Sequence, residues 1–228
     1  MPLLPGLPSV EITLRKSARA RRFSLRVSRL DGRVTLSMPL RAREADALAF
    51  VRDQEGWIRK TLATLPRVDA VGYGASLPFE GRMLTLTPGA GRAVKLEGDS
   101  LLIPGDPAQV ATRVAAFLKI RARDRLAAAS DHYSAALGRP YSSLTLRDTR
   151  SRWGSCTAEG GLMYSWRLIM APPSVLDYVV AHEVAHLDQM NHSPAFWAVV
   201  TRLYPGYQTP RRWLKTQGQA LHGYRFAE

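Results

Sequence analysis

The residues best suited to chemistry are two histidines and a glutamate within five consecutive positions, His182-Glu183-Val184-Ala185-His186. Residues four apart lie on one face of a helix, so both imidazoles can point toward one metal ion. Glu183 is then angled to take a proton from a water held by that ion. This HExxH pattern therefore predicts a metal-dependent hydrolase whose site lies on a helix.

A third ligand is needed, because catalytic zinc sites use three protein groups and keep one position for water. His192 is the candidate, although a continuous helix would rotate it away from the other two histidines. The helix must therefore end first, and Asn191 tolerates the left-handed conformation that ends helices. Ser193-Pro194 then starts a new helix. We expect Zn²⁺ on His182, His186 and His192 as the cofactor.

The alternative is that these histidines are satisfied polar groups in a packed core. Apolar residues surround them on most sides of the expected helix: Val175, Leu176, Val179, Val180, Val184 and Leu187. This helix should therefore be buried. An unpaired buried polar group costs roughly 2–7 kcal/mol, so two histidines and a glutamate need a partner there. The composition of the helix favours a metal site.

A β-rich region should precede the site. Strands are expected at 10–15, 23–28 and 33–38, with a hairpin turn at Asp31-Gly32, followed by a helix over 44–65. Strand-like segments return over 71–103. Pro104-Gly105-Asp106-Pro107 then interrupts the pattern and predicts a boundary near residue 105. The expected organisation is a β-rich N-terminal region with one helix over 1–105 and a hydrolase domain over 106–228.

The hydrolase domain should be mainly helical after a few short strands. A helix is expected over about 108–137, and strands at 144–146, 150–156 and 162–169. Ser174 forms a capping box with Asp177 and should begin the helix that carries the histidines. Ser193-Pro194 and Thr209-Pro210 should begin two more. These elements predict an α+β fold.

The composition limits the class of protein. The 228 residues include 32 Lys and Arg against 19 Asp and Glu, a net charge of +13, and 46% are hydrophobic. These values exclude a disordered tail, a collagen-like repeat and an acidic solubiliser. The single cysteine, Cys156, excludes a disulfide scaffold within the chain and suits a reducing compartment. With no secretory signal at its start and no apolar run long enough for a membrane span, the protein is expected to be cytoplasmic.

Positive charge is concentrated near the start of the chain. From Arg15 to Arg33, eight Arg and Lys residues stand against one Asp, a net charge of +7. Alternation with apolar residues is typical of a solvated strand face. The other interpretation is a surface for phosphate groups, including nucleic acid, for an acidic polypeptide or for anionic lipid. Clustered aromatic residues for base stacking are missing from this stretch, and charge alone does not decide between the two.

Three segments resemble the signature of the YgjP-like metallopeptidases: Arg152-Trp-Gly-Ser-Cys156, Tyr178–Leu187 and Asn191–Trp197. These proteins are minimal zincins related to the SprT-like and WLM groups. The similarity is most specific over 147–205, and the β-helix-β order before it is similar too. It implies a zincin-like catalytic domain with zinc on the three histidines and Glu183 as general base. Hydrolysis of nucleoside triphosphates has also been attached to this family.

Four residues near these segments are candidates for substrate binding: Arg150, Arg152, Trp153 and Tyr164. The two arginines suit a phosphate or a peptide carboxylate, or else form structural ion pairs. The strand near Trp153, or the one over 162–166, is suited to pairing with an extended peptide. Cys156 is expected to be a buried small residue rather than a ligand or a nucleophile.

The sequence therefore predicts a zinc-dependent hydrolase, with a metallopeptidase acting on peptides or proteins as the first choice. One alternative is a phosphoanhydride hydrolase that acts on nucleotides at the same metal site. The other is a zinc protein without hydrolytic activity that contacts nucleic acid through the Arg15–Arg33 stretch.

Overall fold

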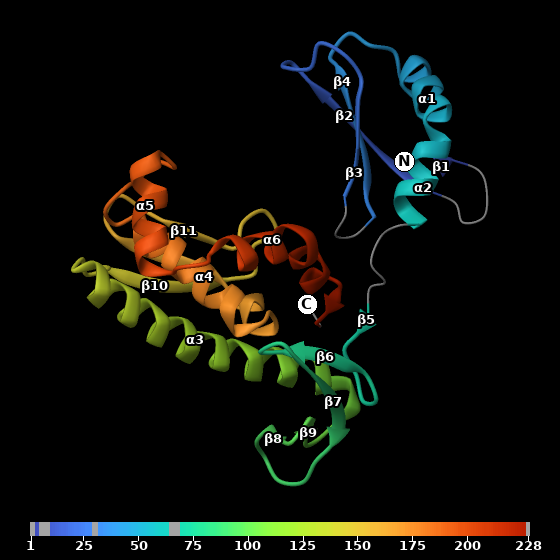
Figure 1. The fold of residues 1–228 in the computed structure, drawn as a ribbon. Coiled ribbons are helices and arrows are strands. Elements are labelled where there is room, and N and C mark those ends of the chain that lie inside the picture. The colour runs from blue at the N-terminus through green and yellow to red at the C-terminus, as the bar shows by residue number, and fades with distance from the viewer. Residues whose placement is uncertain (1–2, 5–9, 29–31, 64–68, 227–228) are drawn as a thin grey trace. The chain divides into compact units, whose positions relative to one another are not determined.

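A computed structural model describes residues 3–4, 10–28, 32–63 and 69–226 (Figure 1). The chain divides into two compact units, Met1–Val68 and Asp69–Glu228. Strands predominate early in the chain and helices late in it, which confirms the predicted α+β class. No helix in the described ranges combines the length and the apolar character that a membrane crossing requires.

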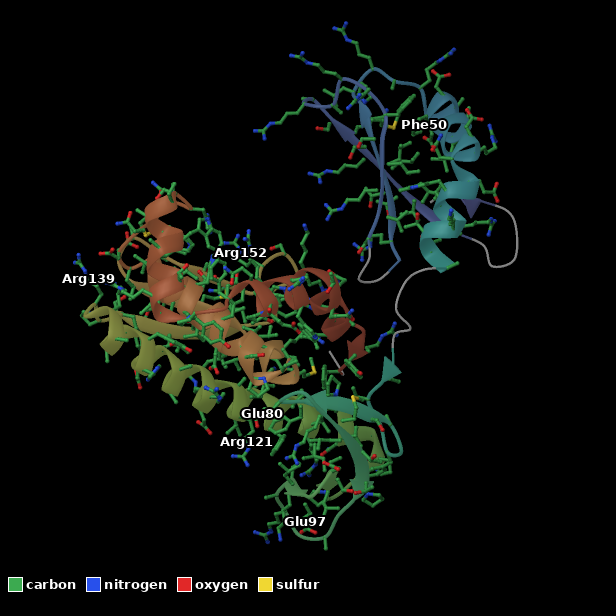
Figure 2. The ribbon with its side chains drawn as sticks, viewed as in Figure 1. Phe50, Glu80, Glu97, Arg121, Arg139 and Arg152 are labelled. Carbon is green, nitrogen blue, oxygen red and sulfur yellow. The ribbon has the colours of Figure 1, made fainter. Side chains whose placement is uncertain are left out.

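The first unit is a four-stranded sheet with two helices on one face. Its strands are β1 (Leu3–Leu4), β2 (Val10–Ser17), β3 (Ser24–Val27) and β4 (Val34–Pro39), in the order β1-β2-β4-β3. The predicted hairpin joins β3 and β4, although Asp31 lies outside the described residues. Helices α1 (Glu44–Asp53) and α2 (Glu55–Ala63) supply Ala47, Val51 and Ile58 to the core. Phe50 of α1 contacts Phe23 near the sheet (Figure 2).

The single helix predicted over 44–65 is two helices, with a break at Gln54. Gly56 stands in the first turn of α2, and glycine is a poor helix former, which weakens a continuous helix there. Residues 64 and 65 lie outside the described part of the chain.

The second unit begins with a β region that packs on a long helix. Strands β6 (Ser76–Phe79), β7 (Arg82–Pro88), β8 (Lys95–Glu97) and β9 (Ser100–Ile103) form a sheet in the order β6-β7-β9-β8. Helix α3 (Val110–Leu137) follows a 3-10 turn, η1 (Pro107–Gln109). Strand β5 (Asp69–Ala70) pairs with β13 (Tyr224–Arg225) near the end of the chain.

The boundary between the units differs from the one expected near residue 105. Leu101 and Ile103 of β9 are fully buried in the same core cluster as Val114 and Leu118 of α3. The run Pro104-Gly105-Asp106-Pro107 therefore turns the chain from a strand into a helix within one core. Proline and glycine occur in tight turns and in domain linkers alike, so their presence does not distinguish the two.

The rest of the second unit holds a three-stranded sheet and three helices. Strands β10 (Ser143–Arg147), β11 (Gly154–Cys156) and β12 (Gly161–Ser165) have the order β10-β12-β11. Helices α4 (Pro173–Ala185), α5 (Pro194–Leu203) and α6 (Gln208–Gln217) follow, then a 3-10 turn, η3 (Gly218–His222). Helix α4 is central, since it contacts α3, α5, α6 and β11 (Figure 1).

Four expected boundaries in this region are wrong. The strand expected over 150–156 begins only at Gly154. The strand predicted to reach residue 169 ends at Ser165, because 166–170 form a fully buried 3-10 turn, η2 (Trp166–Met170). Helix α4 begins at Pro173 without a side-chain cap, so Ser174 lies inside the first turn. Helix α6 begins at Gln208, before the expected cap Thr209. Proline fixes the start of α4 through its own backbone angle, and a serine cap is not needed there.

Candidate metal centre

The HExxH segment forms the end of a buried helix. His182 and Glu183 lie in the last turn of α4, and His186 is the residue that follows its end. The residues of α4 between them and Pro173 are mostly buried, because neighbouring elements cover the helix on several sides. This confirms the expectation of a buried helix and fixes the direction in which its polar side chains point.

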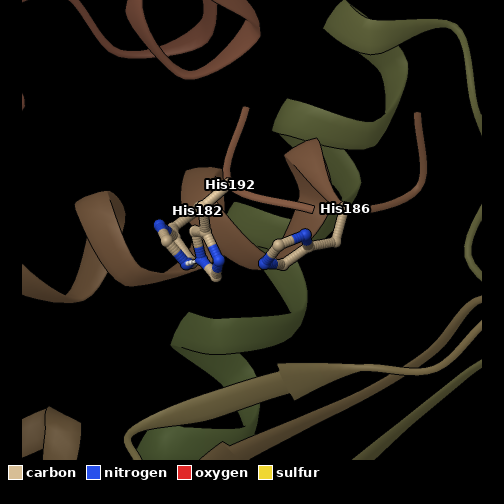
Figure 3. Close-up of side chains that lie close together, drawn as sticks. All are labelled: His182, His186 and His192. Carbon is tan, nitrogen blue, oxygen red and sulfur yellow. Dashed lines mark hydrogen bonds between the residues drawn. The ribbon is translucent and has the colours of Figure 1, made fainter. Parts of the chain in front are cut away.

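Three histidines converge at this helix end (Figure 3). The ligand atoms of His182, His186 and His192 all lie within 4.8 Å of one another. The Nε2 atoms of His182 and His192 are 3.1 Å apart. Two nitrogens bound tetrahedrally to one zinc ion, with Zn–N bonds of about 2.0–2.1 Å, are about 3.4 Å apart. The spacing of this pair therefore suits a shared ion.

The chain reverses after α4 to bring His192 back. The helix ends at Ala185, and the Oδ1 atom of Asn191 accepts a hydrogen bond of 3.2 Å from the backbone N–H of Ser193. Ser193 then caps α5 by accepting from the backbone N–H of Phe196 at 3.4 Å. The predicted stop and restart are thus present. Asn191 contributes through its side chain and not through a left-handed backbone, because Glu80 is the one described non-glycine residue with positive φ.

The imidazoles of His182 and His186 favour the neutral form, which can bind a cation. Burial lowers the pKa of His182 to about 3, and the nearby His186, His192 and Arg211 lower it further. Burial also lowers the pKa of His186. The Nδ1 atom of His186 donates to the backbone carbonyl of Gln189 at 2.9 Å, since a carbonyl can only accept. The lone pair of Nε2 therefore remains available to a metal.

Phe196 is a member of the site that the sequence patterns did not indicate. Its fully buried ring contacts all three histidine rings, with centroid distances of 4.9 Å to His182, 4.4 Å to His186 and 4.8 Å to His192. This apolar ring packs against the three imidazoles and restricts their positions. Its position three residues after the helix cap Ser193 could have indicated this role, because the chain turns back over α4 at the start of α5.

Glu183 lies beside the histidines in a nearly closed environment, with 7% of its surface exposed. Burial raises its pKa to about 8, and the positive charge of Arg152 acts in the opposite direction. Perturbation of this kind, next to a cluster of ligands, is typical of a functional carboxylate.

Gly154 makes room for the Glu183 side chain. A Cβ atom at residue 154 would lie 2.6 Å from both Cγ and Oε1 of Glu183, closer than nonbonded atoms approach. Strand β11 and helix α4 contact each other at this point. Glycine is therefore required for the observed position of the carboxyl group, and only the tertiary contact between β11 and α4 identifies that requirement.

A cavity of about 500 Å³ opens over the three histidines and Glu183. Its other lining residues are Ser151, Arg152, Gly154, Ser155, Cys156 and Met190. Most of these belong to β11 or directly precede it, so one wall of the cavity is the edge of the three-stranded sheet. Metal-ligating side chains, a carboxyl group and a strand edge thus meet in one cavity.

The candidate substrate-binding residues separate into two groups. Arg152 lines the cavity, whereas Arg150 is exposed and is not part of the lining. Trp153 stacks on His222, with ring centroids 4.9 Å apart. Tyr164 is fully buried and its hydroxyl lies 3.2 Å from that of Ser130, so it packs in the core instead of contacting a substrate. It points inward because alternate residues of β12 face the core: Leu162 and Tyr164 are buried, whereas Met163 between them is half-buried.

Cys156 also lines the cavity, where it is half-buried. Burial, with Glu183 nearby, raises the pKa of the thiol to about 11, and Sγ donates to the backbone carbonyl of Thr157 at 3.4 Å. The thiol is therefore protonated at neutral pH, which does not favour a nucleophile. The predicted burial is wrong, because the side chain is half-buried at the wall of the cavity.

A buried arginine links two segments of the chain near the site. Arg167 pairs with Asp148 through two hydrogen bonds of 2.7 and 3.0 Å. It also donates to the backbone carbonyls of Leu221 and Tyr224, at 3.0 and 3.1 Å. These bonds hold the segment before β11 against the C-terminal residues, and that segment carries Arg152 into the cavity.

Comparison with known proteins identifies a family to which the chain is similar. Residues 21–217 match the family model described as the YgjP-like metallopeptidase domain. Among solved structures, the metallopeptidase zymogen of Pyrococcus abyssi abylysin is similar to this chain at 21% identity, with a TM-score of 0.37. That match covers 40% of this chain and 95% of the other. The comparison with curated proteins gives no match.

Proposed function

This chain belongs to the YgjP-like metallopeptidase family, as its resemblance indicated, and we propose that it hydrolyses peptide bonds at a zinc site formed by His182, His186 and His192. The observation that carries this proposal is the convergence of the three imidazoles beside a buried glutamate. Neutral nitrogen donors favour zinc over magnesium or calcium, which prefer oxygen ligands.

The donor set fits the metal. His186 is oriented by its bond to Gln189, and Phe196 packs against all three rings, so the ligands are positioned before any ion binds. When bound, zinc supplies Lewis acidity, which polarises a carbonyl group and makes water a stronger acid. Three protein ligands would leave one coordination position for water, as hydrolytic zinc sites require.

Glu183 acts as the general base in this proposal. Its carboxylate takes a proton from the attacking water and then delivers that proton to the amine nitrogen of the departing product. Arg152 favours the ionised form of Glu183, and so would a cation on the neighbouring histidines. Contact with Gly154 limits the carboxyl group to one place, which keeps the base aligned.

Strand β11 offers a place for an extended peptide. In the described sheet it pairs only with β12, and Ser155 pairs with Met163. The backbone carbonyl of Trp153 and the N–H of Thr157 also bond toward β12. Because backbone groups alternate in direction along a strand, those of Gly154 and Cys156 point away from β12. A substrate strand that pairs with this edge would lie along the cavity.

The phosphoanhydride alternative has less support from the site. A nucleoside triphosphate is polyanionic, whereas Arg152 is the one arginine or lysine among the described residues that line the cavity. The strand edge, in contrast, suits a polypeptide backbone. Release of pyrophosphate from a nucleotide panel, without cleavage of an unstructured protein, would reverse this choice.

Zinc content and metal-dependent cleavage test the proposal directly. We expect one zinc ion per chain by elemental analysis, and cleavage of an unstructured protein such as casein that is lost with 1,10-phenanthroline and restored by zinc. The proposal is wrong if reconstitution leaves the zinc content well below one ion per chain, or if cleavage continues unchanged after the metal is removed.

Gly154→Ala should lower the turnover number about 100-fold, because the new methyl group displaces the Glu183 carboxyl group by an ångström or more. Zinc content should stay at the wild-type value, since the three atoms nearest the added methyl group all belong to Glu183 and not to a histidine. The measurement is kcat and KM together with the zinc content. Gly72→Ala is the matched control, because nothing lies within 4 Å of a Cβ atom there. An active Gly154→Ala enzyme would show that the carboxyl group is not held in place by this contact.

A further inference from the structure

The N-terminal unit has one sheet face that its own helices leave uncovered. Strand residues alternate between two faces, and Val34, Leu36 and Met38 of β4 point into the core with α1 and α2. Thr35 and Ser37 must therefore point to the opposite face. No described element of this unit packs on that side.

Strand register places arginine and hydroxyl side chains together on this open face. Ser37 of β4 lies between Arg15 of β2 and Ser24 of β3. Thr35 lies between Thr13 of β2 and Arg26 of β3 in the next row. Arg15 and Arg26 are thus two strand spacings apart across the sheet, about 9.6 Å, and one row apart along the strands, about 6.8 Å. Their Cα atoms are therefore about 12 Å apart, with hydroxyl groups between them.

Three more arginines lie at the end of the sheet where these rows stop. Arg19, Arg21 and Arg22 are exposed in the connection from β2 to β3, which begins directly after Ser17. We call Arg15, Arg26 and these three residues the basic face. Among the residues that the structure describes, none of the five lies within ion-pair distance of a carboxylate. In Figure 2, nitrogen-tipped side chains extend from this unit on the side away from its helices.

The charge balance of the unit is consistent with an anionic partner. Residues 1–68 include 14 Lys and Arg against 6 Asp and Glu, so this small unit carries +8 of the net charge of +13. A surplus of this size on one unit attracts polyanions over distances near the Debye length, about 8–10 Å.

We propose that the basic face binds the phosphate backbone of nucleic acid without preference for base sequence. Arginine, serine and threonine are among the side chains that contact phosphate oxygens, and here they lie together on one surface. No aromatic residue occupies the two rows, so bases have nothing to stack on. An anionic membrane fits less well, because the rows hold no large apolar side chain to insert into lipid. This inference is independent of the proposed peptidase activity.

Neutralising two arginines of the face tests the proposal. The full-length Arg15→Gln/Arg26→Gln variant is compared with Arg52→Gln/Lys60→Gln, which removes the same charge from exposed positions on α1 and α2. Binding of a short fluorescein-labelled DNA duplex is measured by anisotropy between about 50 and 200 mM salt. Circular dichroism shows whether both variants keep the wild-type fold.

The expected result is a roughly tenfold or greater weakening for the Arg15/Arg26 variant at low salt, for every duplex sequence tested. The slope of log K against log salt should decrease in magnitude by about 1.8, because two phosphate contacts are lost. The control variant should stay close to wild type. Equal weakening of both variants, or weakening of neither, overturns the proposal. Tighter wild-type binding to poly-glutamate or to phosphatidylserine vesicles than to the duplex also overturns it, in favour of an acidic protein or a membrane.

Discussion

Glu183→Gln should abolish peptide hydrolysis while the fold and the zinc content stay unchanged. The amide has nearly the shape of the carboxyl group and fits the space left by Gly154, but it cannot accept the proton of the attacking water. Loss of a general base lowers the rate by roughly 10²–10⁴-fold or more. The measurement is cleavage of casein by the zinc-loaded variant, with metal content determined on the same sample.

Glu97→Gln provides the matched control, because Glu97 is an exposed residue of β8 outside the cavity. It should cleave at the wild-type rate. Wild-type turnover by Glu183→Gln would exclude this residue as the base. A loss of both zinc and activity would instead show that the carboxyl group maintains the metal site and would leave its catalytic role without support.

His192→Ala should weaken zinc binding by more than about 100-fold. Loss of a residue that only hydrogen-bonds to a metal ligand weakens binding by roughly 10–100-fold, and here a ligand itself is removed. Hydrolysis should fall with it. His192 is exposed and lies in the turn before α5, so its removal should leave the helices intact. Zinc affinity is measured by competition with a chelator of known affinity, and circular dichroism checks the fold.

His132→Ala is the control for this experiment, since His132 is an exposed histidine of α3 outside the cluster. Its zinc affinity should equal that of the wild type. Equal affinity in His192→Ala would limit the site to His182 and His186 and would require a third ligand from elsewhere in the chain.

Local spacing determined the centre of the candidate site. His182 and His186 are one helical turn apart, so any helix through this segment places both on one face. The need for a third ligand and the helix-starting pair Ser193-Pro194 together predicted the reversal that brings His192 back. The α+β class and most elements followed from periodicity, because helix and strand patterns depend on neighbouring residues.

Tertiary contacts decided the surroundings of that centre. Gly154 and Glu183 are far apart in the chain, and only the packing of β11 against α4 shows that one makes room for the other. Tyr164 was predicted to bind substrate, but it lies on the face of β12 that packs into the core and is fully buried.

The sequence by itself predicted the type of chemistry, since the identity and spacing of HExxH and His192 are typical of metal ligands and a general base within one short segment. It did not determine where one unit ends, because Pro104-Gly105-Asp106-Pro107 is compatible with either a domain linker or a turn. The burial of Leu101 and Ile103 against α3 shows that this segment is a turn within one unit. Nor did it distinguish which residues near the histidines line the cavity. Those outcomes depend on contacts between segments distant in sequence, and the free energy of such contacts comes from burying surfaces that no local pattern records.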